Sequence, residues 1–156
     1  MHKLVGLLAM LFAIVMVTPS SFGQCYSYPM LDSNEMRIYA HGTCATVYNN
    51  PPNPTKFTID QPRVMTKIAT YHWNDGQGTQ APGTIMLMGP DWKMYGPWQA
   101  EGMPGMGGVP NAYWLVTLPG GVELPPGKYS VIDSDQLTWS HNDETANCGI
   151  VSVVGY

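Results

Sequence analysis

Tyr129–Asp143 reads YSVIDSDQLTWSHND and joins a strand-like segment to the densest group of polar side chains in the sequence. Its first four residues are rich in aromatic and β-branched types, which suit a β-strand. Asp, Ser and Asn oxygens, one Trp and one His follow directly. The stretch therefore predicts a strand whose end carries groups able to bind a ligand, and Tyr71–Asp75 (YHWND) is the next richest segment.

Short strands and turns continue on both sides of this stretch, from Lys56 to the C-terminus. The strand candidates are Val64–Trp73, Thr84–Met88, Met94–Ala100, Ala112–Leu118, Lys128–Ile132 and Gly149–Val154, and the turns include Gly89–Lys93 and Pro119–Gly121. No helical period longer than two turns follows residue 23. This spacing predicts an all-β fold, an antiparallel β-sandwich or jelly roll of about 7–9 strands, preceded by the helix of a signal peptide.

The first 23 residues have the layout of a secretory signal peptide. Lys3 is positive, Leu4–Val17 is apolar, and Ser21 and Gly23 are the small residues expected for cleavage before Gln24. The apolar run is shorter than the ~20 residues of a transmembrane helix, which disfavours the alternative of a retained anchor. Lipidation of Cys25 is a minor alternative. We expect a secreted or periplasmic protein with no membrane contact after cleavage.

Three segments are expected along the chain. Residues 1–23 are the signal peptide, and residues 24–55 are an N-terminal segment that ends in the Pro-rich linker Asn49–Pro54. Proline fixes φ and removes a backbone donor, so this linker interrupts regular structure. Residues 56–156 then form the β-sandwich domain.

The charge balance excludes one class of partner. The chain has eleven Asp and Glu against seven Lys and Arg, with a formal charge of −4, and cleavage would remove Lys3 as well. Binding to nucleic acid requires a basic surface that neutralises phosphates. We therefore expect no nucleic-acid partner, while the oligomeric state stays open.

Export would permit a disulfide, and the chain has three cysteines. We favour a Cys25–Cys44 pair, which would staple the N-terminal segment to itself and leave Cys148 as a small buried residue. The alternative is a Cys44–Cys148 pair, which would tie that segment to the last strand.

Leu124–Val131 (LPPGKYSV) resembles the L-P-x-G-x-Y-x-V hairpin strand of small secreted bacterial β-sandwich domains. The wider set of motifs, including Tyr71–Asn74, Tyr95–Trp98 and Thr138–Ser140, is similar to exported bacterial domains of no settled function. The resemblance covers residues 56–156. It implies the fold and the compartment, and it implies no catalytic residue.

Asp133 and Asp135 are the candidate metal ligands, together with Asp143. Two carboxylates at i and i+2 after a strand point the same way, and a hard cation such as Ca²⁺ would relieve their repulsion. The alternative is that these side chains shape a turn by accepting hydrogen bonds from nearby backbone N–H groups. Apart from Ca²⁺, the sequence suggests no cofactor.

The aromatic content exceeds the needs of a small core and suggests sugar binding, in which rings stack on sugar C–H faces. The candidate ligand-binding residues are Tyr71, Trp73, Trp92, Trp98, Trp139 and His141. We expect most of the rings to be core residues, with Trp92 the best candidate for exposure because it lies in a turn. We also expect the Asp133–Asp135 acids and some indole rings to meet at one edge.

A copper site and catalysis are weaker interpretations. His72 and His141 with Met86, Met88, Met94, Met103 or Met106 offer the imidazole and thioether ligands of copper, without a supporting spacing. The sequence has no G-x-S-x-G, H-E-x-x-H or phosphate-loop motif, so we expect no enzyme. The leading hypothesis is an exported, non-catalytic binding module for a glycan or another cell-envelope component. The alternatives are a structural or assembly protein of the envelope or matrix, and a Ca²⁺- or copper-binding protein.

Overall fold

The structure is a computed structural model that describes residue 29 and residues 31–156. The expected signal peptide and Cys25 lie outside these residues. The described part contains eleven strands and four short 3₁₀ helices. No helix among these residues has the length and apolar character needed to cross a membrane. The predicted all-β fold is confirmed, with more strands than the sequence suggested.

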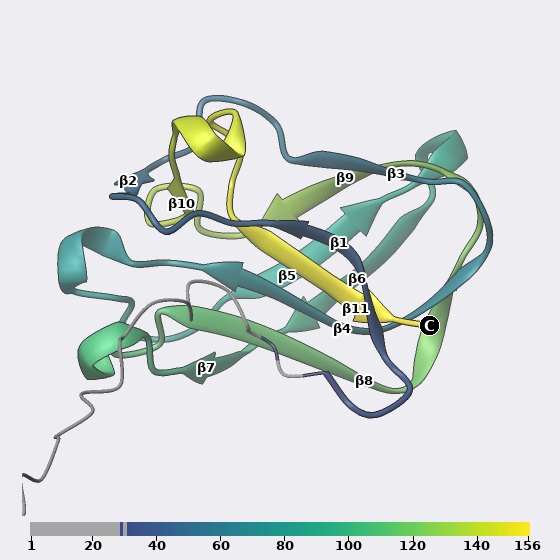
Figure 1. Ribbon diagram of the computed structural model, residues 1–156, viewed down its shortest axis with the longest axis horizontal. Helices are drawn as coiled ribbons and strands as arrows, with labels where there is room; N and C mark the ends of the chain where they lie inside the picture. Colours follow the sequence, from purple (N-terminus) through teal and green to yellow (C-terminus); the bar gives the residue numbers. More distant parts are fainter. Residues whose placement is uncertain (1–28, 30) are drawn as a thin grey trace, which may run out of the picture.

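The first layer is a five-stranded antiparallel sheet. Its order is β1 (Met36–His41), β11 (Val151–Gly155), β4 (Arg63–Tyr71), β8 (Tyr113–Leu124) and β7 (Glu101–Met103). The central strands are β11, β4 and β8 (Figure 1).

The second layer is a four-stranded antiparallel sheet with the order β3 (Lys56–Ile59), β9 (Gly127–Asp133), β5 (Thr84–Met88) and β6 (Met94–Gln99). A small ladder joins β2 (Tyr48–Asn49) to β10 (Ser140–His141). The 3₁₀ helices are η1 (Asn74–Gly76), η2 (Pro90–Trp92), η3 (Met106–Gly108) and η4 (Asp143–Thr145).

One core fills the space between the two layers. Met65 and Ile68 of β4 and Trp114 of β8 are buried in it, in the same cluster as Leu87 of β5 and Tyr129 of β9. The residues next to them along each strand point to the opposite face of the sheet, because successive side chains of a strand alternate between the two faces. This burial of apolar side chains is the main favourable term that holds the sheets together.

The boundary expected at residue 56 needs correction. β1 is hydrogen-bonded along β11, with Tyr39 opposite Val153, so it forms an edge of the main sheet. Lys67 on β4 also pairs with Asp32 and Glu35 just before β1. The segment from Asp32 to His41 is therefore part of the sandwich, and the Pro-rich linker is a connection inside the domain.

The turn expected at Pro119–Gly121 is also wrong. β8 continues through these residues as one strand, and the register slips where Met65 lies opposite Val122 but Lys67 lies opposite Thr117. Gly120 and Gly121 adopt φ of 82° and 74°, a conformation that other residues rarely accept. The glycines thus produce a bulge within the strand instead of reversing the chain.

Candidate functional site

The predicted polar segments meet in a buried cluster at one end of the sandwich. His72 follows the last residue of β4, and Asp133 is the last residue of β9, so the two sheets bring them together. His72 Nε2 lies 3.1 Å from Asp133 Oδ2, and the Thr70 hydroxyl donates to the same oxygen at 2.7 Å. His72 is completely buried and Asp133 is 4% exposed.

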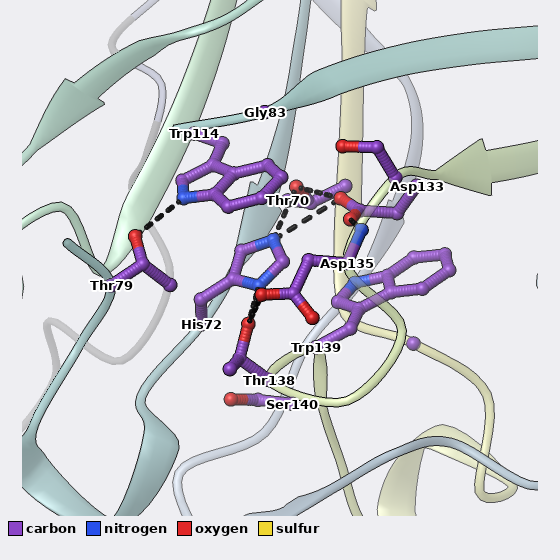
Figure 2. A network of polar contacts seen from close by, with 12 residues as sticks. Thr70, His72, Thr79, Gly83, Trp114, Asp133, Asp135, Thr138, Trp139 and Ser140 are labelled. Carbon is purple, nitrogen blue, oxygen red and sulfur yellow. Dashed lines mark hydrogen bonds and ion pairs between the residues drawn. The ribbon is translucent and has the colours of Figure 1, made fainter. Parts of the chain in front are cut away.

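A second set of contacts surrounds this pair. His72 Nδ1 lies 2.9 Å from Thr138 Oγ1, and the Thr138 hydroxyl donates to Asp135 Oδ2 at 2.8 Å. The backbone N–H of Asp135 donates to Asp133 Oδ1 at 2.8 Å, which is the turn-forming alternative left open by the sequence. Both ring nitrogens of His72 thus face oxygen atoms of the protein (Figure 2).

Two indole rings close the cluster. Trp114 stacks on His72 with ring centroids 3.8 Å apart, and its Nε1–H donates to Thr79 Oγ1 (Figure 2). Trp139 is 1% exposed and donates to the carbonyl oxygen of Ile150. A Cβ at Gly149 would lie 2.1 Å from the Trp139 ring, so the ring packs directly on the backbone. The cluster holds the ends of the sheets together, with Asp133 facing the imidazole directly and Asp135 linked to it through Thr138.

The three predicted metal ligands are used differently. Asp133 and Asp135 belong to the buried cluster, whereas Asp143 is exposed on η4 and accepts a hydrogen bond from Asn147. Within residue 29 and residues 31–156, no group of three His, Cys, Asp or Glu side chains is placed to hold a metal ion.

Most of the predicted ligand-binding rings are core residues. Tyr71 is buried and stacks on the half-buried Trp73, with centroids 6.5 Å apart. His141 is also buried, with Nε2 3.2 Å from the carbonyl oxygen of Asn49. Trp98 is half-buried against the main core. These side chains therefore serve packing first.

Trp92 differs from the other rings, because its side chain is 79% exposed. It lies on η2, in the turn between β5 and β6, which Figure 1 shows at the end of the sandwich opposite η1, η3 and η4. β5 begins beside the Asp133 corner, where Ser134 N–H donates to the Thr84 carbonyl, and runs away from it. Buried indoles thus lie beside the acids as expected, but the exposed indole does not.

A groove of about 600 Å³ lies beside Trp92. One wall is the turn Gly89–Trp92, and the floor is the outer face of β3, β9 and the end of β5. The floor side chains are Lys56, Thr58, Met88, Lys128 and Ser130. Lys56 and Met88 lie opposite Ser130, and Thr58 lies opposite Lys128.

These floor residues were not predicted as part of a site, although their pattern is visible in the sequence. In Lys56–Ile59 and Lys128–Val131, polar residues alternate with Phe57, Ile59, Tyr129 and Val131, which are buried. The alternation places Lys, Thr and Ser on the outer face of each strand. It does not show that β3 and β9 are neighbours, which the fold alone reveals.

The cysteines partly test the disulfide prediction. Cys148 is a free, half-buried thiol, and burial raises its pKa. The alternative Cys44–Cys148 pair is therefore wrong, and Cys148 is less buried than expected. Because Cys25 lies outside the described residues, the Cys25–Cys44 pair stays a prediction.

Comparison with known proteins gives no match to a family model, to a curated protein or to a solved structure.

Proposed function

We propose that this protein is an exported, non-catalytic β-sandwich module that binds a glycan of the cell envelope in the groove beside Trp92. The observation that carries the proposal is the exposure of this indole, 79%, at the wall of a groove of about 600 Å³. Pockets of about 300–1,000 Å³ with an apolar wall and a few polar groups are typical of small-ligand sites.

The groove offers the groups that a sugar ring requires. An indole face accepts the C–H face of the ring, and the Thr58 and Ser130 hydroxyls can exchange hydrogen bonds with sugar hydroxyls. Lys56 and Lys128 add donors on the same floor. A ligand of this kind would lie along the outer face of β3 and β9.

The distribution of acids supports binding without catalysis. Glycoside cleavage generally uses a pair of carboxylates on either side of the scissile bond. The carboxylate in the groove wall is that of Asp91. The two neighbouring carboxylates, Asp133 and Asp135, lie at the opposite end of the sandwich, where they accept hydrogen bonds from threonine hydroxyls. Export is proposed from the signal-peptide pattern of the first 23 residues.

A glycan array with the purified mature protein tests the proposal, using Trp92→Ala as the variant. Tyr48→Ala is the matched control, because Tyr48 is another exposed aromatic residue, 60% exposed, that lies outside the groove. We expect a discrete set of glycans to bind the wild type and Tyr48→Ala, with a loss of at least about tenfold for Trp92→Ala, since stacked aromatic anchors dominate such sites.

If Trp92→Ala bound the same glycans as the wild type, the glycan site would lie outside this groove. An array without hits, from a protein that elutes as an oligomer, would replace the proposal with the assembly role. Met94 and Ile132, 47% and 38% exposed, would then be the first residues to examine on the same sheet.

A further inference from the structure

The two lysines of the groove are close neighbours on one face. Thr58 lies opposite Lys128. Lys56 is two residues earlier than Thr58 on β3, so Lys56 and Lys128 are diagonal neighbours. Diagonal neighbours in an antiparallel pair are separated by about 7–8 Å between backbone positions, within reach of long side chains. Both lysines are exposed. Figure 1 shows β3 and β9 side by side, and η2 lies beside the start of β9.

These lysines also differ from the other cations that the structure describes. The others contact their own chain: Arg37 donates to Ser152, Arg63 to Met36, Lys67 pairs with Asp32 and Glu35, and Lys93 lies over the Tyr95 ring. Across residues 31–156, no hydrogen bond or ion pair engages the side chain of Lys56 or Lys128. Two unpaired ammonium groups therefore share one groove.

The charge of the groove is opposite to that of the protein. The whole chain carries a formal charge of −4, yet the groove has two lysines and one acid, Asp91. Such a reversal selects ligands of negative charge and disfavours cationic ones.

We propose that the groove binds an acidic oligosaccharide whose charges are the carboxylates of uronic acid rings. This inference rests on the proposed glycan-binding function and specifies its substrate class. Each cross-strand pair, Lys56 with Ser130 and Lys128 with Thr58, offers one ammonium and one hydroxyl group. That combination fits a ring with one carboxylate and neighbouring hydroxyls, while Trp92 accepts the face of an adjacent ring.

Calorimetric titration of the mature protein with oligogalacturonate and with its methyl ester tests the inference, because the two ligands share their rings but differ in charge. We expect the acid form to bind about tenfold more tightly at low salt. Lys56→Gln and Lys128→Gln should each weaken binding of the acid by about threefold, and together by about tenfold, with little effect on the ester.

Lys93→Gln is the matched control, since Lys93 lies on the same turn but over the Tyr95 ring. It should leave both affinities unchanged. Raising the salt from about 50 mM to about 500 mM should weaken the acid form selectively, because salt screens exposed charges.

Equal affinity for acid and ester, or a double lysine variant that binds like the wild type, would overturn the inference. If, in that case, Trp92→Ala removed binding of both ligands, the proposed glycan binding would be retained without a preference for acidic sugars. Tighter binding of a sulfated galactan oligosaccharide than of oligogalacturonate would overturn the assignment to carboxylates. A wild type that binds none of the three would overturn both the inference and glycan binding at this groove.

Discussion

At the scale of one residue, the carboxylate of Glu35 ties the segment just before β1 to β4 of the main sheet. Its side chain is 7% exposed and accepts hydrogen bonds from Lys67 Nζ, the Thr66 hydroxyl and the backbone N–H of Asp32. Burial alone would raise the pKa of Glu35, but these hydrogen bonds and the charge of Lys67 lower it to about 2. The charged form is thus favoured in the folded protein.

The lowered pKa of Glu35 predicts a dependence of stability on pH. The contribution is fully present above the ordinary pKa of 4.5 and is lost as the pH falls toward about 2. Solvent screening reduces it to on the order of 1–2 kcal/mol. In urea unfolding, Glu35→Gln should therefore be less stable than the wild type at neutral pH, and the difference should shrink as the pH approaches 2.

Glu101→Gln is the control, because Glu101 is exposed and should differ little from the wild type at either pH. A Glu35→Gln difference that stays constant between neutral and acid pH would show that the charge of Glu35 makes no contribution.

The ends of β4 and β9 show how elements of the two sheets are joined. Thr70 and His72 come from the end of β4 and meet Asp133 at the end of β9. A buried polar group that loses its partner carries an uncompensated desolvation cost. The cluster therefore fixes the relative position of the sheets where the apolar core ends.

Asp133→Ala should accordingly destabilise the protein. It would remove the carboxylate that Thr70 and His72 Nε2 share and leave these two buried groups only their contact with each other at 3.1 Å, at a cost of about 1–3 kcal/mol. Asp60→Ala, at an exposed bend, should cost less than about 0.5 kcal/mol. Denaturant unfolding of both variants measures the difference, and equal midpoints would mean that the cluster adds nothing to stability.

At the scale of the whole molecule, the two ends of the sandwich have different characters. One end carries the buried His72–Asp133 cluster, and the other carries the groove beside Trp92. The carboxylates that suggested calcium belong to the first end, where Asp133 and Asp135 already accept hydrogen bonds from the protein.

We therefore expect the thermal midpoint of the mature protein to be the same with calcium and with a chelator, within about 1 °C. An ion that binds the native state at 100 times its Kd would add about 2.7 kcal/mol and shift the midpoint by several degrees. A shift of that size would restore the calcium hypothesis and direct attention to the exposed Asp143.

The prediction of the fold succeeded where local patterns are informative. The predicted strands Thr84–Met88 and Lys128–Ile132 match β5 and β9 closely. It failed where pairing overrides a local signal, because the Gly120–Gly121 pair forms a bulge against β4 instead of a turn. The first segment was misassigned for the same reason, since its partner β11 is at the far end of the chain.

The local sequence pattern was enough to predict most of the strands after Lys56 and the exposure of Trp92, because alternation and turn residues act over a few positions. Which of these groups come into contact depends on how the strands pair and the sheets pack. His72 and Asp133 are 61 residues apart in the chain, and Lys56 and Lys128 become neighbours through the pairing of β3 with β9. Strand pairing is a long-range contact that the side-chain pattern of a single strand does not specify.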